Sequence, residues 1–156
     1  MLKISADCDC GVLALFDIAY HAAGRRTQTR EIAERQRLSK GHIEQVFQRL
    51  RRGKLVKSQR GPAGGFSLAK PVEEITIGDI VRAIDGPIQL VLCVGDEARS
   101  RAYCERIHSC AARDVWKGAS DLLMSFFDSV TVADLCQRAR DRGIRRVVGQ
   151  GLTYQI

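Results

Sequence analysis

One helical pattern that runs straight into a glycine-rich segment constrains the fold of this chain more than any other feature. After Ser39, a residue suited to capping a helix, four apolar residues recur at the spacing i, i+3, i+4, i+7 until Gly53 ends the pattern; they are Ile43, Val46, Phe47 and Leu50. Two short runs with strand character follow, residues 55–59 and 66–69, on either side of Arg60-Gly61-Pro62-Ala63-Gly64-Gly65. The sequence therefore predicts a helix followed by a β-hairpin with a basic edge.

The neighbouring patterns place this helix third in a series. Residues 11–23 fit a helix closed by Gly24, and a second, short helix contains Ile32 and Ala33. Thr76 begins a further helix after the hairpin, and Gly86-Pro87 ends it. Three helices and then a hairpin is the order of a winged helix-turn-helix, whose third helix enters the major groove of DNA. We therefore expect a mainly α fold with a small β-hairpin wing, and a DNA-binding domain in residues 1–87.

The basic residues are concentrated in the same part of the chain. The whole sequence has 25 lysines and arginines and 18 acidic residues, a formal charge of +7, whereas residues 25–60 alone hold twelve basic and three acidic residues. Such a cluster is the footprint of a surface that binds nucleic acid phosphates, although a bare charge run is equally typical of a solvated helical face. The helix and hairpin inside the cluster favour nucleic acid.

The sequence also limits where the protein acts. No stretch approaches the roughly 20 apolar residues that span a bilayer, so we expect no membrane association. No export signal is recognisable at the amino end. We therefore expect a cytoplasmic protein.

A projection of the third helix at about 100° per residue assigns its exposed side chains. Opposite the apolar face lie Gly41, Gln45, Gln48 and Arg52, flanked by His42, Glu44 and Arg49. Their amide, guanidinium and carboxylate groups are those that read base edges or bind phosphates. At the wing tip, Arg60 and the glycines can bring a guanidinium and backbone N–H groups to a minor groove or to phosphates. A nucleotide-binding loop is disfavoured, because the Lys-Ser/Thr ending of such loops is absent.

Beyond the predicted domain the chain changes character. Residues 88–110 have weak periodicity and contain three cysteines, so this loop needs something other than a hydrophobic core to order it. Residues 111–137 carry a nearly heptad apolar stripe and then a short helix; the stripe consists of Val115, Trp116, Ala119, Leu122, Leu123, Phe126, Phe127 and Val130. We interpret the stripe as a dimerisation helix, since a two-fold protein matches the two half-sites of a palindromic operator; packing within one subunit is the alternative. We expect residues 138–156 to form a mobile, basic tail.

The loop cysteines predict a metal site. Six cysteines in a chain without an export signal point to reduced thiols, for which metal binding or redox chemistry is more typical than disulfides. Cys93, Cys104 and Cys110 lack the CxxC pairs of zinc sites, whereas soft thiolates on a flexible loop suit an iron–sulfur cluster. Four nearby arginines would favour deprotonated sulfur; they are Arg99, Arg101, Arg106 and Arg113. We interpret Cys136 as a packing residue, and packing is also the simpler reading of Cys8 and Cys10.

Several motifs in the chain carry a family resemblance. They include Leu15-Phe16-Asp17-Ile18-Ala19, Arg60-Gly61-Pro62-Ala63-Gly64-Gly65-Phe66, and the segments at 32–36, 38–39, 44–47, 50–56, 77–84 and 131–135. With the three-cysteine loop and Trp116 they cover roughly residues 1–137. In these motifs the chain resembles the winged-helix iron–sulfur transcription regulators typified by IscR, NsrR and RirA.

The resemblance implies a homodimer that binds double-stranded DNA through residues 39–52 and the wing. Contacts to DNA would then come from Ser39, Lys40, His42, Glu44, Gln45, Gln48, Arg49 and Arg52 of the helix, and from Arg60, Gly61, Pro62, Gly64 and Gly65 of the wing. Many members also carry an iron–sulfur cluster near the dimer interface, for which Cys93, Cys104 and Cys110 would be the ligands here.

The fourth ligand of such a cluster differs among the members that the chain resembles. In IscR-like members a histidine follows the third cysteine by three residues, but Arg113 stands there in this chain and cannot serve. In NsrR-like members an acidic residue near the amino terminus of the partner subunit fills the position, and alignment of the first helix places Asp9 there. The alternatives are Asp7, Cys8, Cys10 and His108. Three cysteines and a carboxylate favour a 4Fe-4S over a 2Fe-2S cluster.

The sequence therefore predicts a cluster-dependent DNA-binding regulator, more typically a repressor, that senses nitric oxide, iron or redox state. The alternative is a cluster-free winged-helix regulator whose signal is cysteine oxidation or a protein partner. An enzyme with an activated thiol is disfavoured, because no Cys-His pair with an orienting group emerges from the sequence.

Overall fold

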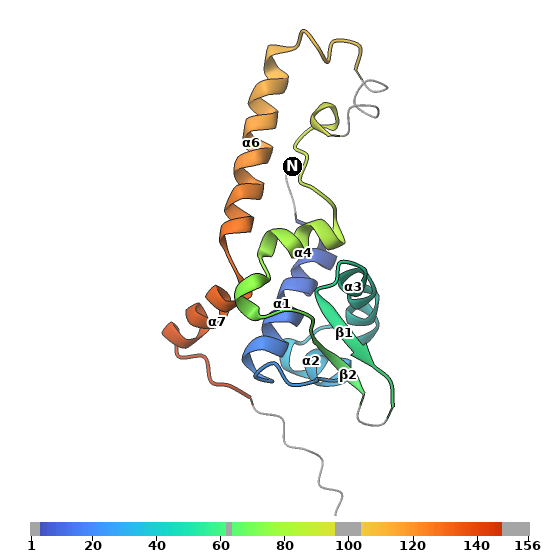
Figure 1. The fold of residues 1–156 in the computed structure, drawn as a ribbon, viewed down its shortest axis with the longest axis vertical. Coiled ribbons are helices and arrows are strands. Elements are labelled where there is room, and N and C mark those ends of the chain that lie inside the picture. The colour runs from blue at the N-terminus through green and yellow to red at the C-terminus, as the bar shows by residue number, and fades with distance from the viewer. Residues whose placement is uncertain (1–3, 62–63, 96–103, 148–156) are drawn as a thin grey trace, which may run out of the picture.

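Side-chain caps begin four of the helices. Ser5 caps α1 (Ala6–Tyr20) by accepting from the Cys8 N–H, and Ser39 caps α3 (Lys40–Arg52). Thr76 and Thr131 begin α4 (Ile77–Ile84) and α7 (Val132–Asp141) with full capping boxes. The computed structural model describes residues 4–61, 64–95 and 104–147 (Figure 1).

The helix-turn-helix is formed by α2 (Thr29–Gln36) and α3, which both pack against α1. Arg37 ends α2 in the left-handed region with φ 54°, so the chain reverses within three residues before Ser39 begins α3. The predicted third helix is confirmed from its cap to Gly53, which follows its last residue.

The wing is an antiparallel hairpin of β1 (Val56–Gln59) and β2 (Gly65–Leu68). Thr27 and Phe66 exchange two backbone hydrogen bonds of 2.8 Å, which add a short bridge at the outer edge of β2. The Phe66 ring also stacks on Phe47 of α3 at a centroid distance of 4.3 Å. These contacts fix the wing to α3 and to the segment between α1 and α2, and the expected winged helix-turn-helix is confirmed.

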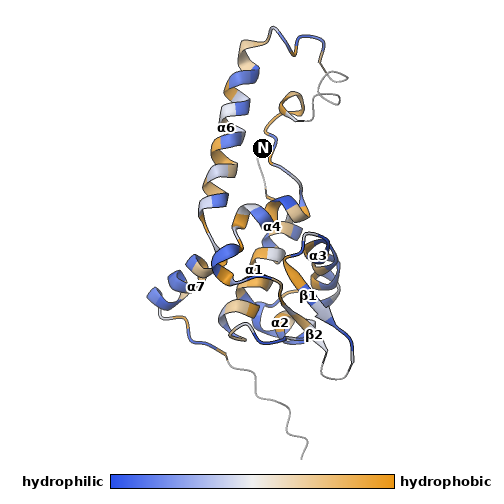
Figure 2. Ribbon diagram, viewed as in Figure 1, coloured by the Kyte–Doolittle hydropathy of each residue, from blue (hydrophilic) through white to orange (hydrophobic). Residues whose placement is uncertain are grey.

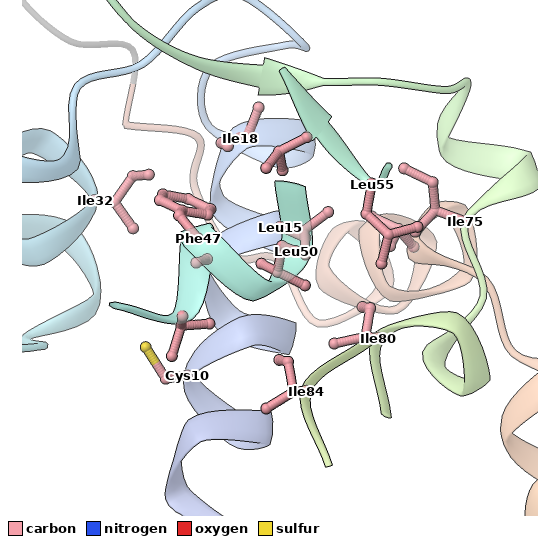
Figure 3. Close-up of a cluster of buried hydrophobic side chains, with 14 of the residues drawn as sticks. Cys10, Leu15, Ile18, Ile32, Phe47, Leu50, Leu55, Ile75, Ile80 and Ile84 are labelled. Carbon is pink, nitrogen blue, oxygen red and sulfur yellow. The ribbon is translucent and has the colours of Figure 1, made fainter. Parts of the chain in front are cut away.

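The core lies where α1, α3 and α4 meet beneath the hairpin (Figure 3). Leu15, Phe47, Leu50 and Ile80 are fully buried there, and the strand-entry residue Leu55 is nearly so. Burying a large apolar side chain stabilises the fold by about 1.5–3 kcal/mol. The DNA-facing side of α3 is therefore presented by a rigid support.

A single long helix, α6 (Ala111–Ser129), stands away from this domain, and its amino end is the distal one (Figure 1). Its carboxyl end is anchored to α4 by an ion pair of 2.6 Å between Arg82 and Asp128 and by the Ile77 N–H, which donates to the Val130 carbonyl. Two short 3-10 helices complete the described elements, η1 (Val72–Glu74) and η2 (Leu92–Val94). Within the described ranges, no helix combines the length and apolarity needed to cross a membrane.

Two segments differ from the sequence-based expectation. The first helix begins at Ala6 rather than at residue 11, because Ser5 supplies a cap that the apolar periodicity does not reveal. The basic tail is partly held in place: α7 continues to Asp141, and Tyr20 of α1 donates to the Ile144 carbonyl at 2.6 Å. Tyr20 also accepts from Arg146 through its carbonyl at 2.7 Å. Residues 148–156 of the tail lie outside the described residues.

Candidate functional site

The outward face of α3 carries free polar side chains. Gln45, Gln48 and Arg52 are exposed, and no side chain of the described residues pairs with them. The opposite face is buried in the core, as the helical projection predicts. Two amides and a guanidinium held on a rigid helix can read base edges in a major groove.

On one flank of this face, two side chains of α3 contact the carboxylate of Asp7, on the first turn of α1. His42 Nε2 lies 2.6 Å from Asp7 Oδ1, and Arg49 Nη1 lies 3.0 Å from Asp7 Oδ2. Arg49 also donates to the Ile84 carbonyl at 3.4 Å. Sequence reasoning treated His42 and Arg49 as DNA contacts and missed their partner, which is 35 residues away from His42.

On the other flank, side chains of α3 form hydrogen bonds with α2 and with the wing. Glu44 accepts from the Thr29 hydroxyl at 3.3 Å and forms a 3.6 Å ion pair with Lys40. Arg51 reaches Ser58 of β1 at 3.3 Å. The structure thus divides the predicted DNA-contact residues of α3 into a free central row and two bonded flanks.

The wing tip places Arg60 in solvent beside a hollow of about 400 Å³ that also borders Gln28 and Gly61. Glycine is required at Gly65, because its φ is +148° and a Cβ there would lie 2.6 Å from the Thr27 carbonyl oxygen. Gly61 is exposed beside Arg60, so the tip offers backbone as well as a guanidinium, two groups that bind phosphates. Pro62, which we expect to contact DNA, lies outside the described residues.

A buried ion pair that the sequence analysis missed holds α2 against α1. Asp17 is completely buried and accepts from Arg35 Nη2 at 2.7 Å and from Gln36 Nε2 at 2.9 Å. The hydrogen bond to Asp17 raises the pKa of the Arg35 guanidinium, against the opposing effect of burial. An acid inside the apolar run 15–19, with Arg35 and Gln36 downstream, was the pattern that could have indicated it.

Two of the three loop cysteines lie at the amino end of α6. Cys110 is the N-cap residue of α6, and the Arg113 guanidinium donates to the Cys93 carbonyl at 2.9 Å. Cys93, Cys104 and Cys110 are free thiols and partly exposed. Residues 96–103 of the loop lie outside the described part. Among the described residues, no three His, Cys, Asp or Glu side chains are arranged to hold a metal ion, so the structure does not bring these cysteines and Asp9 to one centre.

The remaining cysteines are packing residues. Burial, with smaller contributions from neighbouring aspartates, raises the pKa of the Cys8 and Cys10 thiols to about 11. Burial also raises the pKa of Cys136. A thiol that resists deprotonation is a poor metal ligand. Asp9, between Cys8 and Cys10, is instead exposed, and no described side chain pairs with its carboxylate.

The α6 helix leaves an apolar row in solvent. Val115 is 66% exposed, Leu122 is 73% exposed and Phe126 is 58% exposed, at the spacing i, i+7, i+11. Figure 2 shows apolar residues recurring along the length of α6. Phe127 and Met124 point the other way and pack against the core. The stripe predicted from sequence is therefore split, and only part of it contacts the chain's own domain.

Comparisons with known proteins agree with this architecture. A family model described as "Rrf2: Iron-dependent Transcriptional regulator" matches residues 4–138. The HTH-type transcriptional regulator IscR of Yersinia pseudotuberculosis is 34% identical over 134 residues, which are 86% of this chain and 79% of that protein.

Two solved structures share the fold at appreciable identity. IscR of T. potens has a TM-score of 0.71 and 31% identity, and the match covers 99% of this chain and 97% of that one. CymR of B. subtilis, described as the global cysteine regulator, has a TM-score of 0.65 and 33% identity, with 88% and 98% covered. The chain is thus a transcriptional regulator and not an enzyme, and it belongs to the Rrf2 family.

Proposed function

We propose that the chain is a cytoplasmic, iron–sulfur cluster-dependent repressor that binds a palindromic operator as a homodimer and responds to nitric oxide, iron or redox state. The observation that carries this proposal is the position of two loop cysteines: Cys110 is the N-cap residue of α6, and the Cys93 carbonyl accepts a hydrogen bond from Arg113 on the first turn of α6. These two cysteines therefore lie at the amino end of the helix whose apolar row is exposed.

The donor set fits an iron–sulfur cluster chemically. Three partly exposed thiols are available, while the other three cysteines are buried. The N–H groups at the amino end of the 19-residue α6 favour an anionic ligand or cluster beside Cys110. When bound, the cluster supplies an iron that reacts with small molecules. The chain's contribution is to hold the thiols and to exclude competing ligands.

Asp9 is the fourth ligand we favour. Asp7 is already bonded to His42 and Arg49, and Cys8 and Cys10 are buried with raised pKa values. His108 is exposed within the loop and stays the alternative. Because no group of metal-ligating side chains assembles within the described part of one chain, a ligand from the partner subunit suits the proposal.

The exposed row on α6 supports the homodimer. Val115, Leu122 and Phe126 follow the heptad spacing of a helix that packs against another helix. A second copy of α6 in this row would bury all three side chains and place two α3 helices for two half-sites.

A change at the thiols can reach the DNA interface through continuous contacts. The carboxyl end of α6 is bonded to α4 by Arg82 and Asp128, and α4 packs against α3. A coupling of about 1–3 kcal/mol changes DNA affinity by roughly 5- to 150-fold. Such a change is sufficient for a transcriptional switch.

The cluster is tested by anaerobic purification followed by iron and sulfide analysis, absorption spectroscopy and native mass spectrometry. We expect a coloured dimer whose mass gives the cluster type. Cys93→Ser, Cys104→Ser and Cys110→Ser should each lose the colour, whereas the control Cys136→Ala should keep it. A wild-type protein that stays colourless after reconstitution with iron and sulfide would refute the cluster.

DNA reading is tested separately by fluorescence anisotropy on operator and random duplexes. Arg60→Ala should weaken binding to both, because it removes a phosphate contact, whereas Gln45→Ala should change the preference among operators. Arg140→Ala, on α7, is the control that removes a charge elsewhere. Equal losses on both duplexes for Gln45→Ala would contradict this division of roles.

A second candidate function is a cluster-free regulator with a thiol switch. It is favoured by the partial exposure of the loop thiols and by the likeness to CymR. Mass spectrometry after mild oxidation should then find disulfide or sulfenic acid at Cys93, Cys104 or Cys110, and the DNA affinity should change with it.

A further inference from the structure

Asp7, on the first turn of α1, contacts two side chains of α3 at once, the His42 imidazole and the Arg49 guanidinium. Its Oδ1 lies 2.6 Å from His42 Nε2, and its Oδ2 lies 3.0 Å from Arg49 Nη1. A carboxylate only accepts hydrogen bonds, so the contact with His42 places a proton on Nε2. All three side chains are between 30% and 45% exposed, so this cluster lies at the surface beside the outward face of α3.

The same two groups are where a DNA phosphate would be bound. When a helix enters a major groove, its central row faces the bases and its flanks face the two phosphate backbones. The central row of α3 is Gln45, Gln48 and Arg52, and His42 and Arg49 form one flank. A phosphate on that flank would be drawn to the same Arg49 guanidinium and His42 Nε2 that the Asp7 carboxylate contacts, so the carboxylate and the phosphate compete for them.

We infer that Asp7 sets the strength of phosphate-backbone binding at this DNA interface by acting as a charge latch. The latch is the Asp7 carboxylate bonded to His42 and Arg49; it withholds these groups from the DNA backbone and cancels one positive charge beside it. Phosphate contacts carry no sequence information, whereas the side chains of the central row do. Because phosphate contacts form on any sequence, the latch lowers the affinity for operator and random DNA alike, and the central row supplies the discrimination between them.

The latch is distinct from the other flank. The acidic residue on that flank is Glu44, which belongs to α3 itself. Its carboxylate accepts a hydrogen bond from Thr29 and forms an ion pair with Lys40, so it pairs with no arginine. The latch uses none of the cluster ligands that we favour, so its test is separate from the test of the cluster.

The test measures binding of the full chain to a random-sequence duplex between about 50 and 200 mM salt by fluorescence anisotropy. Asp7→Asn should bind random DNA more tightly and steepen the salt slope by about 0.9, the value for one added phosphate contact. That slope corresponds to a gain roughly threefold larger at the low salt concentration than at the high one. On a selected operator the gain and the steepening should be of similar size, because a phosphate contact carries no sequence information.

Matched variants separate the latch from a general charge effect. Asp141→Asn removes the same charge on α7, where the carboxylate accepts only from Gln137 in the described structure, and it should leave the slope unchanged. In an Arg49→Gln background, Asp7→Asn should no longer steepen the slope, because the cation that it releases is gone. Asp7→Ser serves as a second variant if the asparagine chain folds poorly.

Three outcomes overturn the inference. Weaker random binding by Asp7→Asn means that the carboxylate positions Arg49 for DNA. An unchanged slope means that no cation is released. An equal steepening in the Arg49→Gln background means that the charge change acts without the latch.

Discussion

The buried pair between Asp17 and Arg35 gives the most demanding test of this structure. Arg35→Met removes the guanidinium and leaves the Asp17 carboxylate, which has no exposed surface, with one donor, Gln36 Nε2 at 2.9 Å. The methionine fills much of the space of the arginine stem, so lost packing contributes little. The variant therefore isolates the cost of an unpaired buried charge.

The magnitude follows from the burial of both partners. The Arg35 side chain is 11% exposed and the Asp17 side chain 0%, so solvent screens the pair very little. Removing one partner of a buried ion pair costs about 3–5 kcal/mol. For a domain of this size 1 kcal/mol shifts the Tm by roughly 2–4 °C, so we expect the Tm to fall by about 10 °C.

The assay is urea and thermal unfolding followed by circular dichroism, at one protein concentration so that self-association does not differ between variants. The double variant with Asp17→Ala and Arg35→Met removes both charges and should be more stable than Arg35→Met alone. A double-mutant cycle then gives the interaction free energy. A loss below about 1 kcal/mol for Arg35→Met, or strictly additive losses, would refute the reasoning.

Three further predictions concern the wing, α6 and His21, the residue that follows α1. Gly65→Ala should cost more than about 1 kcal/mol and weaken DNA binding, because its Cβ meets the Thr27 carbonyl, whereas Gly118→Ala, which meets nothing within 4 Å, should be neutral or stabilising in the same unfolding assay. Phe126→Glu should convert the proposed dimer to a monomer in light scattering; a persisting dimer would place the interface elsewhere. Burial lowers the pKa of His21 below 6.5, so its contribution to stability is complete above about pH 6.5 and declines as the pH falls towards the lowered value. His21→Gln should flatten that decline in unfolding measured from pH 7 to 5, and an unchanged profile would contradict it.

The local patterns of the chain predicted its elements well. Helix and strand periodicity, capping residues and glycine breaks act over a few residues, so α3, its buried and outward faces and the hairpin could be derived before any tertiary contact was considered. The sequence also favoured packing roles for Cys8, Cys10 and Cys136, and all three are buried in the structure.

The pairing of the charged side chains could not be derived in this way. Asp7 with His42 and Arg49, and Asp17 with Arg35, join residues far apart in sequence, and any of many basic residues satisfies the same pattern. Only the packing of α1 against α2 and α3 selects the partners. The amino-acid order is enough to specify a winged helix with a basic reading surface, since short-range periodicity controls it, whereas the choice of which cations are free to meet DNA depends on long-range contacts that exist only in the folded chain.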